Sequence, residues 1–179
     1  MKIAFDSCIL IHAFDDQEEN QERAELRLRA TILMQELEDS QDTILIPSPA
    51  LAEFLIPYPI EKHDRLIAEM AKHFVFASLD VKGGRDSARL WLEHATIKNA
   101  RHARLRNEKI TRQQFKFDVI IVACAKASGA SRFYSTDAGC RELAETAGMV
   151  PLDLPLNHPD MFKDDEMRKA HANKLKRKK

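Results

Sequence analysis

Four acidic residues stand where apolar segments of the chain begin or end. Asp6 follows the apolar residues 3–5, Glu53 lies within residues 50–55, Asp118 precedes the apolar run 119–125, and Asp137 follows residues 131–135. Carboxylates that pack together raise one another's pKa, and a bound divalent cation removes this conflict. Because oxygen-only ligands suit hard cations, these residues predict a site for Mg²⁺ or Mn²⁺.

Each of these acidic residues, taken alone, also has an ordinary structural interpretation. Asp118 and Asp137 suit the N-cap position of a helix, which needs no metal. Glu53 could face solvent on an otherwise apolar helix, and Asp6 could form the turn after a strand. The joint placement of the four is what favours a common site.

The elements that must position them follow an alternating pattern. Short β-type runs occupy residues 2–5, 43–46, 74–77, 131–135 and 149–153, and apolar residues at helical spacing lie between them, as at Leu26, Ala30, Leu33 and Leu37. This alternation predicts an α/β fold with a parallel sheet covered by helices on both faces. Ligands bind such sheets beyond the carboxyl ends of the strands, where strand order reverses, so all four carboxylates are candidates for one crevice.

Local signals place several element boundaries. Ser48 before Pro49 is typical of a helix N-cap followed by a first-turn proline, and Gly129 and Gly148 stand where helices end. We expect the helix that contains residues 119–125 to begin near Asp118 and to be covered on several sides. Trp91, among apolar residues at helical spacing, is expected in the core rather than as a base-stacking platform.

The composition indicates one compact domain, which we expect to span residues 1–157, with a basic tail at 158–179. The chain has 179 residues, of which 44% are hydrophobic, and its apolar runs are too short to cross a bilayer. Its three cysteines form no CxxC pair, as is typical of a reduced compartment. We therefore expect a cytoplasmic protein with no membrane partner.

Charge is balanced overall but unevenly distributed. Of the 28 Lys and Arg residues seven lie within positions 168–179, which contain no acid, so the preceding chain has 21 basic against 28 acidic residues. A second basic segment, residues 98–116, leads into Asp118 and could contact phosphates. Its candidate nucleic-acid-binding residues are Arg101, Arg104, Arg106, Lys109, Arg112 and Lys116. An exposed helix whose cations balance acids elsewhere would show the same pattern.

The sequence resembles the PIN-domain family of metal-dependent ribonucleases over residues 2–154. The resemblance is carried by residues 3–7 (IAFDS), 48–55 (SPALAEFL), 117–123 (FDVIIVA) and 135–137 (STD), which occur in the family's order. Cys8 departs from the family, which often has a polar residue there. The segment 15–42 and the tail are longer than in the compact toxin members.

The resemblance implies a three-layer α/β/α fold with a five-stranded parallel sheet of order 3-2-1-4-5 and endonuclease activity on RNA. It implies that Asp6, Glu53, Asp118 and Asp137 are catalytic and surround the metal, while Ser7 and Ser135 support the site by hydrogen bonding. Because the family includes toxin-like members, the resemblance also implies an antitoxin protein and a second copy of the chain, in a homodimer, as candidate partners.

Other functions remain as alternatives at this point. A PIN-like module that binds RNA or protein without cutting is the main one, although such a module has no need of a carboxylate cluster. A phosphatase with an aspartyl nucleophile would need a second Asp where Cys8 stands, and a receiver domain would need an acidic pair before Asp6. Cys8 itself is expected to be a buried apolar residue rather than a nucleophile.

Overall fold

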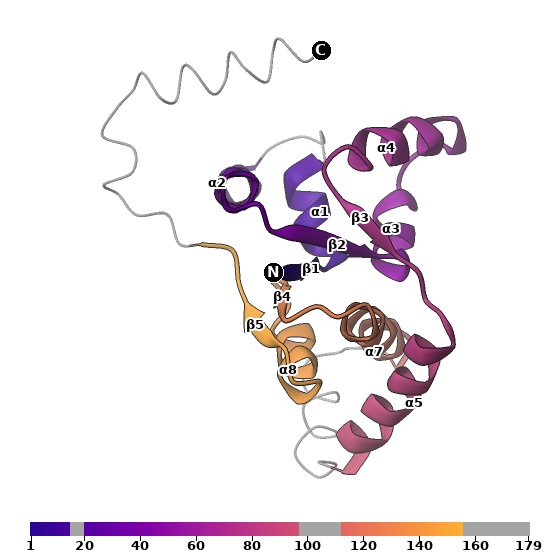
Figure 1. The fold of residues 1–179 in the computed structure, drawn as a ribbon. Coiled ribbons are helices and arrows are strands. Elements are labelled where there is room, and N and C mark those ends of the chain that lie inside the picture. The colour runs from indigo at the N-terminus through magenta and orange to yellow at the C-terminus, as the bar shows by residue number, and fades with distance from the viewer. Residues whose placement is uncertain (15–19, 97–111, 156–179) are drawn as a thin grey trace, which may run out of the picture.

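The computed structural model describes residues 1–14, 20–96 and 112–155 (Figure 1). The strands are β1 (Lys2–Phe5), β2 (Thr43–Pro47), β3 (Val75–Ala77), β4 (Arg132–Tyr134) and β5 (Val150–Leu152). The helices are α1 (Ser7–Phe14), α2 (Gln21–Ser40), α3 (Ser48–Leu55), the 3-10 helix η1 (Ile60–Lys62), α4 (His63–Met70), α5 (Val81–Thr96), α7 (Arg112–Ala127) and α8 (Ala138–Thr146).

The five strands form one parallel sheet in the order β3-β2-β1-β4-β5, which confirms the predicted topology. The central strand β1 pairs with β2 on one side and β4 on the other, with Ile3 opposite both Ile44 and Arg132. Along the chain, β2 and then β3 are added on one side of β1, whereas β4 and then β5 are added on the other side. Strand order therefore reverses between β1 and β4, and a ligand is expected beyond the carboxyl ends of these two strands.

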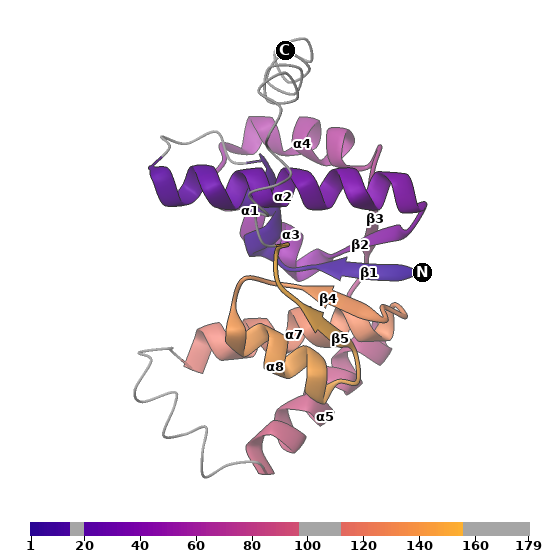
Figure 2. The ribbon, with the colours of Figure 1, turned by 90° about the vertical axis from the view of Figure 1, so that its left-hand side faces the viewer.

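Two helical layers cover the sheet, with α1, α2 and α4 on one face and α5, α7 and α8 on the other (Figures 1 and 2). Each strand contributes side chains to a hydrophobic core on both faces of the sheet, since successive side chains point to opposite faces. Ile3 and Phe5 of β1 lie in the first core, whereas Ala4 lies in the second. Helix α3 reaches both, because Phe54 belongs to the first core and Ala50 to the second.

The expectation that the central helix begins near Asp118 is wrong, because residues 112–117 already belong to α7. Phe115, Val119 and Val122 follow one another at helical spacing and pack in the second core or against it. The apolar face of the helix thus continues before Asp118, and the aromatic ring of Phe115 lies 5.1 Å from that of Trp91. Trp91 packs against this core, as expected.

The predicted N-cap at Ser48 is also wrong, since Ser48 is the first residue of α3 and Pro47 holds the cap position. The Ser48 hydroxyl accepts a hydrogen bond from the Leu79 amide at 3.2 Å instead. The predicted helix-ending glycines are confirmed, because Gly129 and Gly148 have φ angles of 86° and 74°, which a side chain would strain.

The predicted tail, residues 158–179, lies outside the described residues. Within the described ranges, no helix combines the length and apolar character needed to cross a membrane.

Truncation of Phe133 tests whether β4 anchors the second core. Its ring is completely buried, so Phe133→Ala is expected to lower the free energy of unfolding by about 3–5 kcal/mol, measured by urea denaturation. Val81→Ala is the control, because Val81 is 91% exposed and should change stability by no more than about 0.5 kcal/mol. Equal effects of the two substitutions would contradict this description of the core.

Candidate active site

Asp6 lies directly beyond the carboxyl end of β1 and is 4% exposed. One carboxylate oxygen, Oδ1, accepts a hydrogen bond from the Ser7 amide at 2.7 Å, and the other, Oδ2, accepts one from the Ser135 hydroxyl at 2.7 Å. The Asp6 amide donates to the carbonyl of Tyr134 at 3.0 Å. Hydrogen bonds therefore fix this carboxylate between the ends of β1 and β4.

Glu53 approaches the site from α3 and is half-buried. Its Oε2 accepts a hydrogen bond from the Ser7 hydroxyl at 2.7 Å. That hydroxyl lies farther from Asp6 Oδ1, at 3.4 Å, so its single proton is directed to Glu53. Burial and the charge of Asp6 raise the pKa of Glu53, and the Ser7 hydrogen bond opposes them.

Asp137 follows β4 and is the N-cap of α8, as its ordinary structural interpretation predicted. Its Oδ1 accepts hydrogen bonds from the amides of Gly139 and Cys140, the latter at 3.0 Å. Its own amide donates to the Ser135 hydroxyl at 3.0 Å. Capping uses Oδ1 in both bonds, and Oδ2 accepts no hydrogen bond from a described residue.

Asp118 lies within α7 rather than at its start, so the N-cap interpretation of this residue fails. Burial is the main cause that raises the pKa of Asp118 from its ordinary 3.8 to about 7, followed by the charges of Asp6, Asp137 and Glu53. A hydrogen bond from Cys140 opposes the increase. The negative charges of the three other acids therefore act on the carboxyl group of Asp118.

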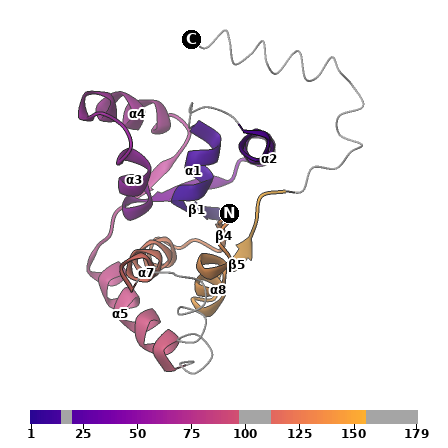
Figure 3. The ribbon, with the colours of Figure 1, turned by 180° about the vertical axis from the view of Figure 1, so that it is seen from behind.

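The structure brings the four predicted carboxylates to one edge of the sheet. Helix α3 contacts both α1 and α7, and α7 contacts α8, so the four acids come from neighbouring elements grouped around β1 and β4 (Figure 3). Among the described residues, no group of three or more His, Cys, Asp or Glu side chains already converges as a set of metal ligands. The charges of Asp6, Asp137 and Glu53 nevertheless raise the pKa of Asp118, so the four carboxylates lie within electrostatic range of one another.

Two thiols line the same region. Burial and the charge of Asp6 raise the pKa of the Cys8 thiol to about 12, although the Thr136 amide donates to its sulfur at 3.3 Å. Burial likewise raises the pKa of Cys140 well above its ordinary value. A thiol must lose its proton to act as a nucleophile, so this raised pKa disfavours that role for Cys8 at neutral pH. Cys8 is half-buried and its sulfur contacts Asp6 and Thr136, so the expected apolar role is not what the structure shows.

The predicted basic residues fall only partly within the described chain. Arg101, Arg104, Arg106 and Lys109 lie outside the described residues. Arg112 and Lys116 are on α7, and Lys116 is exposed two residues before Asp118.

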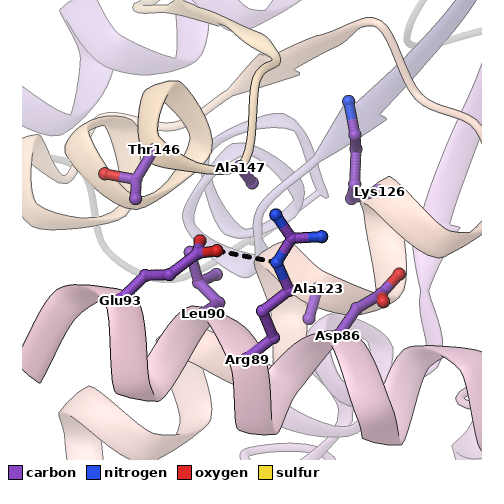
Figure 4. A pocket seen from close by; sticks show the side chains of 8 residues that line it. All are labelled: Asp86, Arg89, Leu90, Glu93, Ala123, Lys126, Thr146 and Ala147. Carbon is purple, nitrogen blue, oxygen red and sulfur yellow. Dashed lines mark hydrogen bonds and ion pairs between the residues drawn. The ribbon is translucent and has the colours of Figure 1, made fainter.

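A cavity of about 250 Å³ lies away from these carboxylates, between α5, α7 and α8 (Figure 4). Arg89 and Glu93 of α5 form an ion pair of 2.7 Å in its lining, and Lys126 donates to the carbonyl of Gly148 at 3.2 Å. None of the four carboxylates lines this cavity, so it is separate from the candidate active site.

Sequence analysis missed two residues that contact the site. Cys140 hydrogen-bonds Asp118, and Arg141 of α8 donates from Nη1 to the Ser135 carbonyl at 2.6 Å. The available signal was their spacing, since Arg141 follows Asp137 by four residues, which is about one helical turn.

No family profile matches the sequence, and neither does any curated protein. Solved structures do share the fold. A chain of VapBC2 from Rickettsia felis, crystallised with a DNA fragment from its promoter, has a TM-score of 0.52 and 14% identity over 87% of this chain and 100% of that chain. A chain of VapBC-1 from nontypeable Haemophilus influenzae has a TM-score of 0.52 and 13% identity over 86% of this chain and 98% of that chain.

At such identities the likeness establishes the fold alone. The sheet order and the two helical layers are those that the PIN resemblance implied. The chain therefore has the PIN-type α/β/α fold.

The raised pKa of Asp118 predicts an unusual pH dependence in metal-free buffer. Between about pH 4 and pH 7 the folded state keeps a proton on Asp118 that the unfolded state has lost, so rising pH destabilises the fold until both states are ionised. Asp118→Asn removes this penalty and should raise the free energy of unfolding at pH 8 by about 1–2 kcal/mol, since solvent reaches part of the side chain. The gain should vanish near pH 4, as measured by urea denaturation with EDTA.

Glu145→Gln is the matched control, because Glu145 is an exposed acid on α8. It should leave the difference between pH 4 and pH 8 unchanged. A less stable Asp118→Asn protein at pH 8 would contradict the clustering of the four carboxylates.

Proposed function

We propose that this chain is a metal-dependent endoribonuclease whose active site is the carboxylate cluster. The observation that carries the proposal is the convergence of four acids from separate elements on one sheet edge, where burial and its neighbours raise the pKa of Asp118 to about 7. Within the described chain no Lys, Arg or His forms an ion pair with any of the four. Among the described residues, therefore, no paired cation stabilises the ionised form of the cluster.

The donor set fits a hard divalent cation. Asp6, Asp118, Asp137 and Glu53 offer carboxylate oxygens, which suit Mg²⁺ or Mn²⁺, and these residues would hold the ion. A bound divalent cation lowers the pKa of a water molecule and offsets the charge that develops on a phosphodiester during hydrolysis. Hydrolysis of this type leaves a 5′-phosphate and a 3′-hydroxyl.

The residues of the chain would share the remaining work. Ser135 orients the carboxylate of Asp6, and Ser7 orients that of Glu53, through the hydrogen bonds of 2.7 Å described above. Glu53 is then directed either to the ion or to the attacking water. Asp137 keeps Oδ2 for the site while Oδ1 caps α8.

RNA is the proposed substrate because basic residues precede Asp118 directly. Lys116 is exposed on the helix that carries Asp118, and Arg112 belongs to the same helix. Such cations contact phosphates without selecting a sequence. The other basic residues of 98–116 and the tail at 158–179 extend this prediction beyond the described residues. Three free thiols agree with a reducing, cytoplasmic setting.

A toxin of a toxin–antitoxin pair is the more specific proposal. Its support is that both structural neighbours described above belong to VapBC assemblies. A small antitoxin protein would then be the partner, and a homodimer remains a prediction of the PIN resemblance. A short neighbouring gene whose product co-purifies with this chain and stops RNA cleavage would support this assignment.

The alternative is a PIN-like module that binds RNA or protein without cutting it. The clustered carboxylates favour the enzyme, because repulsion among them destabilises a module that never binds a cation.

Cleavage of a 5′-labelled RNA by the purified full chain tests the proposed activity. Wild-type protein should cut the RNA with Mg²⁺ or Mn²⁺ and leave it intact with EDTA. Asp118→Asn should lower the rate by about 100-fold or more, because a lost ligand removes several kcal/mol of transition-state stabilisation. End analysis should find 5′-phosphates.

Glu145→Gln again serves as the control and should cleave at the wild-type rate. Undiminished cleavage by Asp118→Asn in a nuclease-free preparation, or cleavage that persists in EDTA, would exclude this mechanism. Mn²⁺ binding without any cleavage would favour the binding module.

A further inference from the structure

Arg141 joins three segments at the edge of the sheet that carries the carboxylates. From one turn into α8, its Nη1 donates to the carbonyl oxygen of Ser135 at 2.6 Å and lies 3.1 Å from Oδ2 of Asp153. Ser135 follows β4, and Asp153 follows β5. One guanidinium therefore links α8 to the carboxyl ends of both strands.

Ser135 is in turn hydrogen-bonded to two of the candidate metal ligands. Its hydroxyl donates to Oδ2 of Asp6 at 2.7 Å and accepts a hydrogen bond from the Asp137 amide at 3.0 Å. The residue is fully buried, so its carbonyl needs a donor, and a charged donor makes a strong hydrogen bond. A displaced Ser135 would move the support of Asp6 and Asp137 together.

Asp153 is itself held on two sides. Besides Arg141, Arg29 of α2 approaches its Oδ1 to 3.9 Å. Arg29 donates to the carbonyls of Leu154 and Pro155 at 2.7 Å and 2.8 Å, which fixes the segment that follows β5. Asp153 is thus an ordered anchor for Arg141 although it is partly exposed.

We propose that Arg141, anchored by Asp153, is a positioning residue of the active site that holds Ser135 so that Asp6 and Asp137 keep the places needed to bind the cation. The inference deepens the proposed function and rests on it, because it assigns Arg141 a role in the same carboxylate site. The guanidinium of Arg141 contacts Ser135 and Asp153, so Arg141 acts on the ligands through Ser135. Residues that orient metal ligands in this way typically change metal affinity or activity by about 10- to 100-fold when they are lost.

Mn²⁺ titration by calorimetry and steady-state RNA cleavage, both on the full chain, test this role. Arg141→Met keeps an unbranched apolar side chain, although a shorter one, and removes all the donors. It should weaken Mn²⁺ binding about tenfold and lower kcat about tenfold or more, with KM within about twofold of wild type. Arg141→Lys should restore part of each loss, because an ammonium can still donate to the carbonyl or pair with Asp153, although it is one bond shorter and lacks the planar guanidinium.

Arg89→Met is the matched control, since Arg89 also forms an ion pair on a helix but lies at the separate cavity between α5, α7 and α8 (Figure 4). It should leave Mn²⁺ affinity and kcat unchanged. If Arg141→Met fails to fold, Asp153→Asn replaces it, because this variant removes the anchor and leaves Arg141. Asp153→Asn should also weaken Mn²⁺ binding and lower kcat, but by less than Arg141→Met.

Hydrogen exchange of the Asp137 amide gives a third measurement that needs neither metal nor RNA. This amide donates to the Ser135 hydroxyl, so its exchange should accelerate about tenfold in Arg141→Met but not in Arg89→Met. A folded Arg141 variant that keeps the wild-type values of amide exchange, Mn²⁺ affinity and kcat would overturn the role of Arg141 and leave the nuclease proposal intact. If wild type binds Mn²⁺ without cleaving RNA, the nuclease proposal fails and Mn²⁺ affinity decides the role of Arg141. If it binds no Mn²⁺, the amide exchange decides.

Discussion

The hydrogen bond between Ser135 and Asp6 joins the two strands on which the site is built. β1 and β4 lie side by side in the sheet, so the residues that follow them meet at one edge, and Asp6 is buried there among neutral donors. Ser7 adds Glu53 from α3, and the turn after Ser135 adds Asp137. The same parallel topology that buries Ile3 and Phe133 therefore also determines where the carboxylates lie.

That placement opposes the stability of the metal-free fold. Four acids share one edge, and the pKa of Asp118 rises to about 7 because its ionised form is both desolvated and repelled. Hydrogen bonds stabilise Asp6 and Asp137, whereas the described residues offer Asp118 only the hydrogen bond of Cys140, whose thiol is a weak donor. Under the proposed function, Asp118 is consequently the carboxylate whose ionised form a bound cation would stabilise most.

The alternation of short strands and helices was sufficient to predict a parallel sheet covered by helices, and the ends of its strands indicated the edge on which the acids meet. The strand order came from the PIN resemblance, and the structure has that order. The sequence was insufficient where a residue's role depends on tertiary contacts. Ser48 looked like a cap, but its hydroxyl binds the Leu79 amide, which lies 31 residues away. Arg141 carried no motif, because its significance lies in Ser135 and Asp153, which only folding brings to it.

The corrected start of α7 changes how substrate and site are connected. Had the helix begun at Asp118, the basic residues before it would have been separated from the acid by a helix terminus. Instead Lys116 and Asp118 belong to one continuous helix, whose apolar face at Phe115 and Val119 packs against the second core. Two residues along a helix are about 200° apart around its axis, so Lys116 and Asp118 point to different sides of α7. Under the proposed function, α7 would therefore carry a metal ligand on one side and a phosphate contact on another, at a fixed offset along one rigid element.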